Sequence, residues 1–179
     1  PWLVPNTRID LAAHVSLPAR DTFNPTTASL QQANELNRKA QSDGTLPIHI
    51  HAIPVDQLNF GSFSGVAWGV RPDGSSQGGY LIYATSHALH KGQAAPLGIS
   101  DWQSWKLTRK RRSSLSAEIQ AMADSVGMLS FVRLFFVDCL HSKGIDLRRP
   151  DEILRLLPES CAITDCKCLH GACAKNEAQ

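Results

Sequence analysis

The pattern of hydrophobic and polar positions in this 179-residue chain changes its period twice. Residues 9–15 predict at best a short amphipathic helix, which Pro18 closes. Over residues 27–42, apolar side chains recur at helical spacing. Thr26 or Thr27 can serve as the N-cap of this helix, and Asp43-Gly44 is a typical stop signal. The first part of the chain is therefore predicted to be helical.

From residue 48 onward the pattern favours strands. Residues 48–53 alternate like a strand with one solvated face. Residues 58–68 and 79–84 are rich in β-branched and aromatic side chains, and they flank a turn that contains Pro72-Asp73-Gly74. Two such runs around a glycine-rich turn predict a hairpin. A further strand is predicted over residues 99–105.

The helical period returns over residues 114–141, with Ser113 or Ser114 as the N-cap. The apolar stripe of this long helix consists of Leu115, Ile119, Met122, Val126, Leu129, Val132 and Phe136. A short helix over 151–157, a short buried strand over 161–164 and the start of a last helix complete the prediction.

Composition places the chain among ordinary globular proteins, with 42% hydrophobic and 19% charged residues. A formal net charge of +2 is too small to imply a polyanionic partner by itself. No apolar run reaches the roughly 20 residues that a bilayer crossing needs, and no signal segment stands at the start. The chain begins at Pro1, so we expect it to be cut from a longer product.

Five cysteines, an odd number, are best interpreted as reduced thiols of an intracellular protein. Cys161, Cys166, Cys168 and Cys173 lie near His170, but they contain no Cys-x-x-Cys pair. A structural zinc is therefore not expected.

Glu118 is the most informative acidic residue. It lies three positions after Leu115 and four before Met122, so a helix places it beside the apolar stripe. A carboxylate near a core is costly unless it is paired, hydrogen-bonded or bound to a cation. The alternative is a glutamate at the edge of the stripe, paired with Arg111 or Arg112.

Asp165 follows the short strand 161–164 at its carboxyl end, where open α/β sheets place their ligands. Its alternative role is the N-cap of the last helix. Both roles remain open at this stage.

Five basic residues fall within seven consecutive positions just before the long helix: Lys106, Arg109, Lys110, Arg111 and Arg112. In a protein that acts on nucleic acids they would contact phosphates without base specificity. The alternative is a solvated loop. Nearby, Trp102 and Trp105 are either stacking surfaces for bases or part of the core.

The order of these features resembles the ribonuclease H domain at the end of copia-type retrotransposon polyproteins. Three motifs carry the resemblance: residues 75–82 (Ser-Ser-Gln-Gly-Gly-Tyr-Leu-Ile), residues 102–110, and residues 113–119 (Ser-Ser-Leu-Ser-Ala-Glu-Ile). Asp165-Cys166-Lys167 is similar to the family's second-strand aspartate, and residues 7–11 are similar to a Thr-Arg-Pro-Asp segment near the end of its reverse transcriptase.

The resemblance assigns Glu118 and Asp165 as catalytic residues and metal ligands, with Mg²⁺ or Mn²⁺ as the cofactor if the domain is active. The family's first catalytic aspartate is expected after Ser64, where this chain has Gly65. Asp73 is no obvious substitute, because its Pro-Asp-Gly context is that of a hairpin tip. A fourth acidic residue would lie beyond Gln179. Half of the expected carboxylate set is missing.

The resemblance therefore implies an α/β fold: a ribonuclease H-like mixed sheet with an antiparallel meander, a long helix and a parallel strand, incomplete at the C-terminus. Residues 1–46 are expected to be a helical remnant of the reverse transcriptase domain, and 47–179 a partial ribonuclease H-like domain. The ancestral activity is two-metal hydrolysis of RNA in RNA–DNA hybrids, which we expect to be lost here. The alternative is a fragment that binds nucleic acid weakly or has no function.

Overall fold

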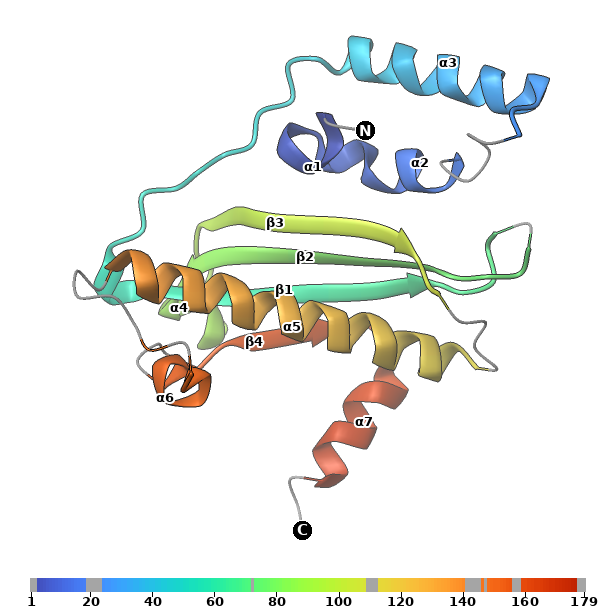
Figure 1. Cartoon of the computed structure of the whole chain (residues 1–179). Coiled ribbons are helices and arrows are strands. Elements are labelled where there is room, and N and C mark those ends of the chain that lie inside the picture. The colour runs from blue at the N-terminus through green and yellow to red at the C-terminus, as the bar shows by residue number, and fades with distance from the viewer. Residues whose placement is uncertain are drawn as a thin grey trace.

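The computed structural model describes residues 3–18, 24–71, 73–108, 113–140, 146, 148–155 and 159–176. Its centre is a four-stranded mixed sheet with the order β3-β2-β1-β4 (Figure 1). Strands β1 (Leu58–Ala67), β2 (Gln77–Ser86) and β3 (Leu97–Lys106) form an antiparallel meander. Strand β4 (Cys161–Thr164) lies parallel to β1 at the other edge. The predicted α/β class, the meander and the parallel strand are confirmed.

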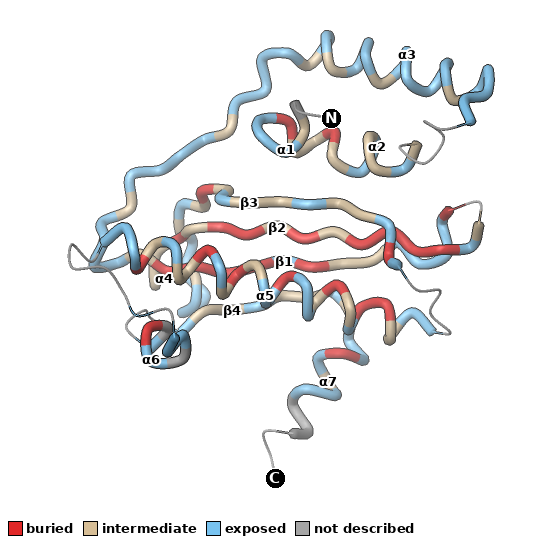
Figure 2. Tube along the Cα trace, in the orientation of Figure 1, coloured by how far each residue is buried: buried red, intermediate tan, exposed pale blue. Residues whose placement is uncertain are grey.

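The long helix α5 (Ser114–Leu140) covers one face of the sheet (Figure 1). The core lies between this helix and the two central strands, as the buried segments in Figure 2 show. Its fully or nearly buried members are Phe60, Tyr80, Ile82, Leu129 and Val132. The Phe60 ring also packs against Phe136, with 4.7 Å between ring centroids. Burial of these side chains is the main stabilising contribution to the fold.

Short helices α1 (Leu3–Thr7) and α2 (Ala12–Ser16), joined by the 3₁₀ turn η1 (Ile9–Leu11), lie along β3 on the other face of the sheet. Trp102 shows that these helices lie on this face. It pairs with Leu81, whose side chain points to the face opposite the core residues Tyr80 and Ile82. The indole Nε1 of Trp102 donates to the Val4 carbonyl at 3.0 Å. The two segments expected to be separate domains are therefore in contact at β3.

Helix α3 (Thr27–Ser42) has the predicted bounds and the predicted N-cap. The Thr26 hydroxyl accepts from the Ser29 backbone, and the Ser29 hydroxyl accepts from the Thr26 backbone, which completes a capping box. None of the helix's residues is buried. Arg8 ties α3 to the N-terminal helices by donating from Nη1 to the Ala40 carbonyl at 2.8 Å.

The strand predicted over residues 48–53 is wrong: this segment has no strand partner and crosses from α3 to the sheet as an extended connection (Figure 1). Alternation alone does not make a strand, because the backbone must also pair with a neighbouring strand. The edge strands β3 and β4 each have one unpaired side in the described sheet, but residues 48–53 form no ladder with either. Ile50 is 88% exposed.

The remaining elements are short. They are the 3₁₀ turn η3 (Val55–Gln57), and the helices α4 (His87–His90), α6 (Pro150–Leu154) and α7 (Lys167–Asn176). Helix α7 follows β4 and projects away from the sheet on the side of α5 (Figure 1). No helix in the described ranges combines the length and the apolarity that crossing a membrane would require.

Candidate functional site

The parallel strands β1 and β4 separate at a fork, and the three sequence positions that the resemblance singled out meet there. The last paired residues are Ser64 and Thr164. Gly65 follows Ser64 in β1, and Asp165 directly follows the last residue of β4. The fork is therefore at the carboxyl ends of two parallel strands, the usual place for ligands in an open α/β sheet.

Glu118 reaches this fork from α5. A hydrogen bond from the Val66 backbone meets its carboxylate. Beyond Ser64 the pairing of β1 with β4 has ended in the described part of the sheet, and Glu118 contacts β1 there. Gly65 thus lies between Ser64, which pairs with β4, and Val66, which contacts Glu118.

Small side chains bring α5 close to the sheet at this end. Ala117, Ala121 and Ser125 follow one another at four-residue spacing on the buried face of the helix, and all three are fully buried. Toward the other end of α5 the buried face carries the larger Leu129 and Val132. A helix can pack more closely on a sheet where its side chains are small. The end of α5 that carries Glu118 therefore packs closely on β1.

The environment of Glu118 is unusual for a carboxylate. Only 9% of the residue is exposed, and its Oε2 atom has no hydrogen-bond partner among the described residues. Burial raises the pKa of Glu118, the charge of Asp165 raises it further, and the hydrogen bond from Val66 acts in the opposite direction. A buried oxygen without a partner is the group in this fork that a cation would satisfy.

Asp165 is exposed and close enough for its charge to act on Glu118. It does not occupy the N-cap position of α7. The carbonyl of Cys166 accepts the first helical hydrogen bond, from His170 N at 3.1 Å, so Cys166 holds that position. The Cys166 amide in turn donates to the Thr164 hydroxyl. The Asp165 carboxylate is thus left facing solvent beside the fork.

Gly65 lies in regular strand geometry, and a Cβ built on it meets nothing within 4 Å. Strand alternation places such a Cβ on the face opposite Ser64, whose hydroxyl contacts the Met122 sulfur of α5 at 3.6 Å. A glycine is therefore not required here by packing or by the backbone. Without a side chain at position 65, space remains open on that face of the sheet, next to the fork.

The described residues contain no group of three or more His, Cys, Asp and Glu side chains arranged to hold a metal ion. Glu118 and Asp165 supply two carboxylates, which fit one weakly held divalent cation. They do not fit the pair of ions, about 4 Å apart, that two-metal hydrolysis uses. The five cysteines are all free thiols.

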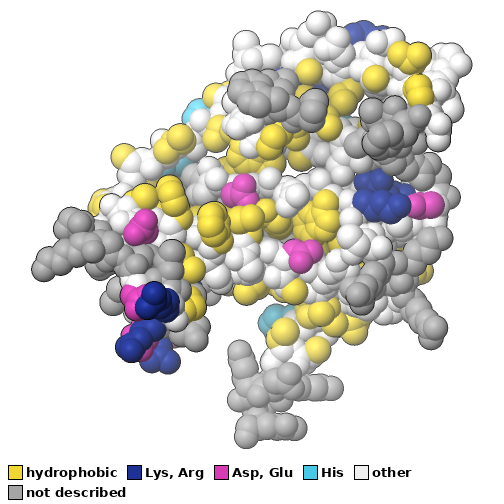
Figure 3. All heavy atoms as spheres, viewed as in Figure 1, with side chains coloured by type: hydrophobic (Ala, Val, Ile, Leu, Met, Phe, Trp, Pro, Cys, Tyr) yellow, Lys and Arg dark blue, Asp and Glu magenta, His cyan; other side chains and the backbone are white. Residues whose placement is uncertain are grey.

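Hydrophobic side chains also gather on the outer surface of α5, whereas basic side chains lie toward the margins of the same view (Figure 3). Of the predicted basic run, only Lys106 belongs to the described residues; Arg109, Lys110, Arg111 and Arg112 lie outside them. Lys106 forms an ion pair with Asp73. Its ammonium group is therefore already engaged by a carboxylate.

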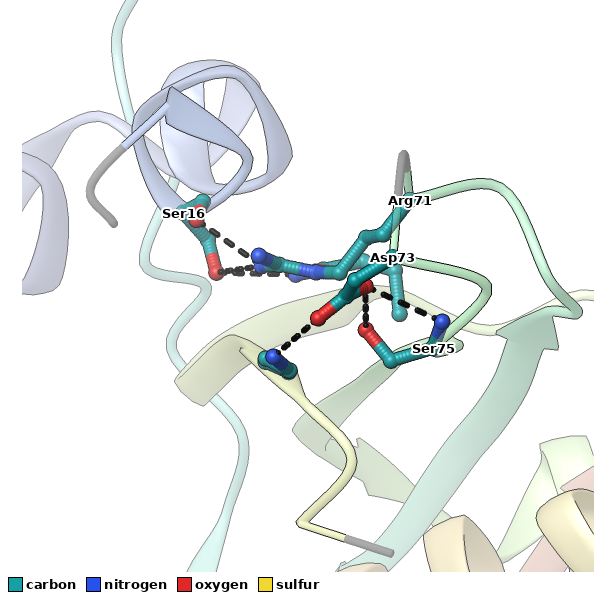
Figure 4. A network of polar contacts seen from close by, with 6 residues as sticks. Ser16, Arg71, Asp73 and Ser75 are labelled. Carbon is teal, nitrogen blue, oxygen red and sulfur yellow. Dashed lines mark hydrogen bonds and ion pairs between the residues drawn. The ribbon is translucent and has the colours of Figure 1, made fainter. Parts of the chain in front are cut away.

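Asp73 acts as the centre of the hairpin tip (Figure 4). It accepts from the backbone amide and the hydroxyl of Ser75 as well as from Lys106. These donors hold the pKa of Asp73 well below its usual range. Asp73 is thus a turn residue, as expected, and it lies on the hairpin rather than at the fork.

Arg71, next to this tip, joins the hairpin to the N-terminal helices (Figure 4). It is 4% exposed, and its guanidinium donates to the Ser16 carbonyl at 2.9 Å and to Gln77 Oε1. Sequence reasoning did not single out this residue, because neither partner is predictable from spacing. The same holds for Val66, which contributes to the site through its backbone.

Comparison of the chain with protein-family models, with curated proteins and with solved structures found no match. The fold and the geometry of the fork therefore carry the functional argument on their own.

Proposed function

We propose that this chain is a ribonuclease H-like domain of copia-type descent that has lost hybrid cleavage and keeps a weak site for one divalent cation. The observation that carries the proposal is the fork itself. It gathers Glu118, Asp165 and the glycine that replaces the expected first aspartate at adjoining positions of β1, α5 and β4. Three positions far apart in the sequence thus lie close together, which supports the proposal.

Loss of cleavage follows from the ligand count. Hydrolysis of a phosphodiester by two metal ions needs carboxylates that hold both ions. One ion positions the attacking water, and the other stabilises the leaving oxygen. Glycine at position 65 offers neither an oxygen nor a side chain that could rearrange. Losing a central ligand costs about three to five decades in rate, or roughly 4–7 kcal/mol of transition-state stabilisation.

The decisive experiment incubates the purified chain with an RNA–DNA hybrid and either Mg²⁺ or Mn²⁺. We expect no cleavage above that of the Glu118→Gln variant. Robust cleavage that Glu118→Gln abolishes would show that the site is still catalytic. If both proteins cleave the hybrid equally, the activity comes from a contaminating nuclease rather than from the fork.

Cation binding is the second part of the proposal and has its own readout. Mn²⁺ broadens the NMR signals of nuclei near its site, so we expect broadening of the Val66 and Asp165 amides at millimolar Mn²⁺. Glu118→Gln should weaken it. Glu35→Gln on the exposed helix α3 is the matched control and should not. Equal broadening in both variants would place the cation elsewhere.

A further inference from the structure

A groove of about 580 Å³ runs between α5 and β3, on the face of the sheet that α5 covers. It lies away from the fork, on the opposite side of the core from β4. Its lining combines aromatic rings with a carboxylate: Tyr80, Trp105, Asp124, Gly127 and Phe131 are the members that matter here.

Aromatic rings form part of this groove: Tyr80 is nearly buried beneath it, whereas Trp105 is partly exposed. Tyr80 and Trp105 lie with ring centroids 5.6 Å apart and planes tilted by 58°. Phe131 projects from α5 and is 62% exposed. Aromatic faces of this kind attract cations through their quadrupole.

The charge in the groove is negative. Asp124 is exposed on its helical side, and the Tyr80 hydroxyl donates to Asp101 Oδ2 at 3.0 Å on the strand side. Burial first, and then the charges of these two carboxylates, raise the pKa of Tyr80. No lysine or arginine is among the described residues that line the groove. The basic side chains in Figure 3 lie outside the group of hydrophobic side chains on the outer surface of α5.

Gly127 is the feature that packing does not explain. It lies near the middle of the 27-residue helix α5, where glycine costs roughly 1 kcal/mol relative to alanine. A Cβ built on it meets nothing within 4 Å, so no neighbour excludes a side chain. The effect of the glycine is to keep the groove open at its helical wall.

We propose that this groove binds the guanidinium group of an arginine side chain presented by a partner polypeptide. A guanidinium is planar, so it stacks on the partly exposed ring of Trp105, and its N–H groups donate to a carboxylate such as Asp124 at the same time. Lysine, with a compact and strongly hydrated ammonium, uses only part of this lining. The open groove between a strand and a helix leaves room for the chain that carries the arginine.

The test follows the indole N–H signal of Trp105 by two-dimensional NMR, assigned by its loss in Trp105→Phe. The probes are a short capped peptide with one arginine and the same peptide with citrulline, which is neutral and nearly isosteric. We expect the arginine peptide to shift this signal with a dissociation constant on the order of 1 mM, and the citrulline peptide to bind at least about fivefold more weakly.

Three variants locate the interaction. Asp124→Asn should weaken arginine binding about fivefold, and Gly127→Leu should abolish it by filling the groove. Asp138→Asn, an exposed aspartate of the same helix outside the groove, is the matched control and should leave binding unchanged. The proposal is overturned if citrulline and arginine peptides bind alike, or if Asp124→Asn behaves like Asp138→Asn. The comparison of the two peptides on the unaltered chain remains decisive if a variant fails to fold.

Discussion

The backbone of Val66 forms a hydrogen bond with the Glu118 carboxylate two residues beyond the last pair of β1 and β4. A side chain from the helix thus contacts β1 just after the parallel pairing ends. This contact holds one carboxylate oxygen in a buried position and leaves the other without a partner in the described part of the chain. The stability of the fold should therefore depend on the charge of Glu118.

Glu118→Gln is expected to raise the free energy of unfolding at pH 7 by roughly 1–3 kcal/mol, because it removes a buried, incompletely paired charge. The pKa of Glu118 is raised above its ordinary value of 4.5 in the folded chain. Its stabilising contribution is therefore complete below pH 4.5 and is lost as the pH rises through the raised pKa.

Urea unfolding of both proteins across a pH series measures this effect. The difference between them should grow as the pH rises above 4.5 and then level off. Carboxylates with lowered pKa values, such as Asp10 and Asp73, act in the opposite direction but are common to both proteins. A pH-independent difference would mean that Glu118 titrates normally.

Gly65→Asp is expected to tighten Mn²⁺ binding by only about threefold, since it adds a negative charge beside the fork but on the sheet face opposite α5 and Glu118. The space around position 65 admits the side chain. Isothermal titration calorimetry gives the affinity. Gly127→Asp introduces the same charge at another open glycine, on α5, and should leave the affinity unchanged. Equal affinities for the two variants would argue against a cation site at the fork.

Gly61→Ala is expected to destabilise the chain by about 2–3 kcal/mol through overpacking. A Cβ at this position would overlap the phenol ring and hydroxyl of Tyr83, which is fully buried and packs on Phe63 with ring centroids 5.0 Å apart. Chemical denaturation measures the loss. Tyr83→Phe is the informative companion: the buried Tyr83 hydroxyl has no partner among the described residues, so its removal should be neutral or stabilising.

Gly127→Ala is expected to stabilise the chain by roughly 0.5–1 kcal/mol, because it removes the entropic cost of a helical glycine without a clash. The same change at Gly74 should have the opposite sign. Gly74 has φ +72°, a conformation that alanine rarely adopts. Thermal melting of both variants separates the two cases, and a destabilising Gly127→Ala would reveal a packing role for the glycine.

Arg71→Ala is expected to release α1 and α2 from the sheet, with a loss of about 2–3 kcal/mol, because Arg71 donates charged hydrogen bonds to Ser16 and Gln77. Hydrogen exchange over residues 3–18 should accelerate. Arg149→Ala removes an exposed arginine paired with Glu152, and its effect should stay within about 0.5 kcal/mol. Unchanged exchange in Arg71→Ala would mean that Trp102 and its contact with Val4 suffice to hold these helices.

Sequence alone determined the local elements, because their signals lie within a few residues of one another. Helix α3 begins after its Thr26 cap, α5 begins at the predicted Ser114, and β4 has the predicted bounds. The predicted stripe of α5 is wrong at Ile119 and Val126, which are exposed, because small residues such as Ala117 form the buried face at that end. The glutamate beside the stripe of α5 was also visible as a conflict between charge and burial.

Tertiary structure decided everything that depends on which segments meet. Residues 48–53 alternate as well as β4 does, yet they form no ladder with either edge strand of the described sheet, so they are a connection rather than a strand. The N-cap of α7 is Cys166 rather than Asp165, because the helix begins at Lys167, one residue later than an Asp165 cap would require. Above all, only the parallel pairing of Ser64 with Thr164 brings Gly65, Glu118 and Asp165 to one fork. Periodicity fixes which face of an element is apolar, whereas the pairing of distant strands is fixed by the packing of the whole chain.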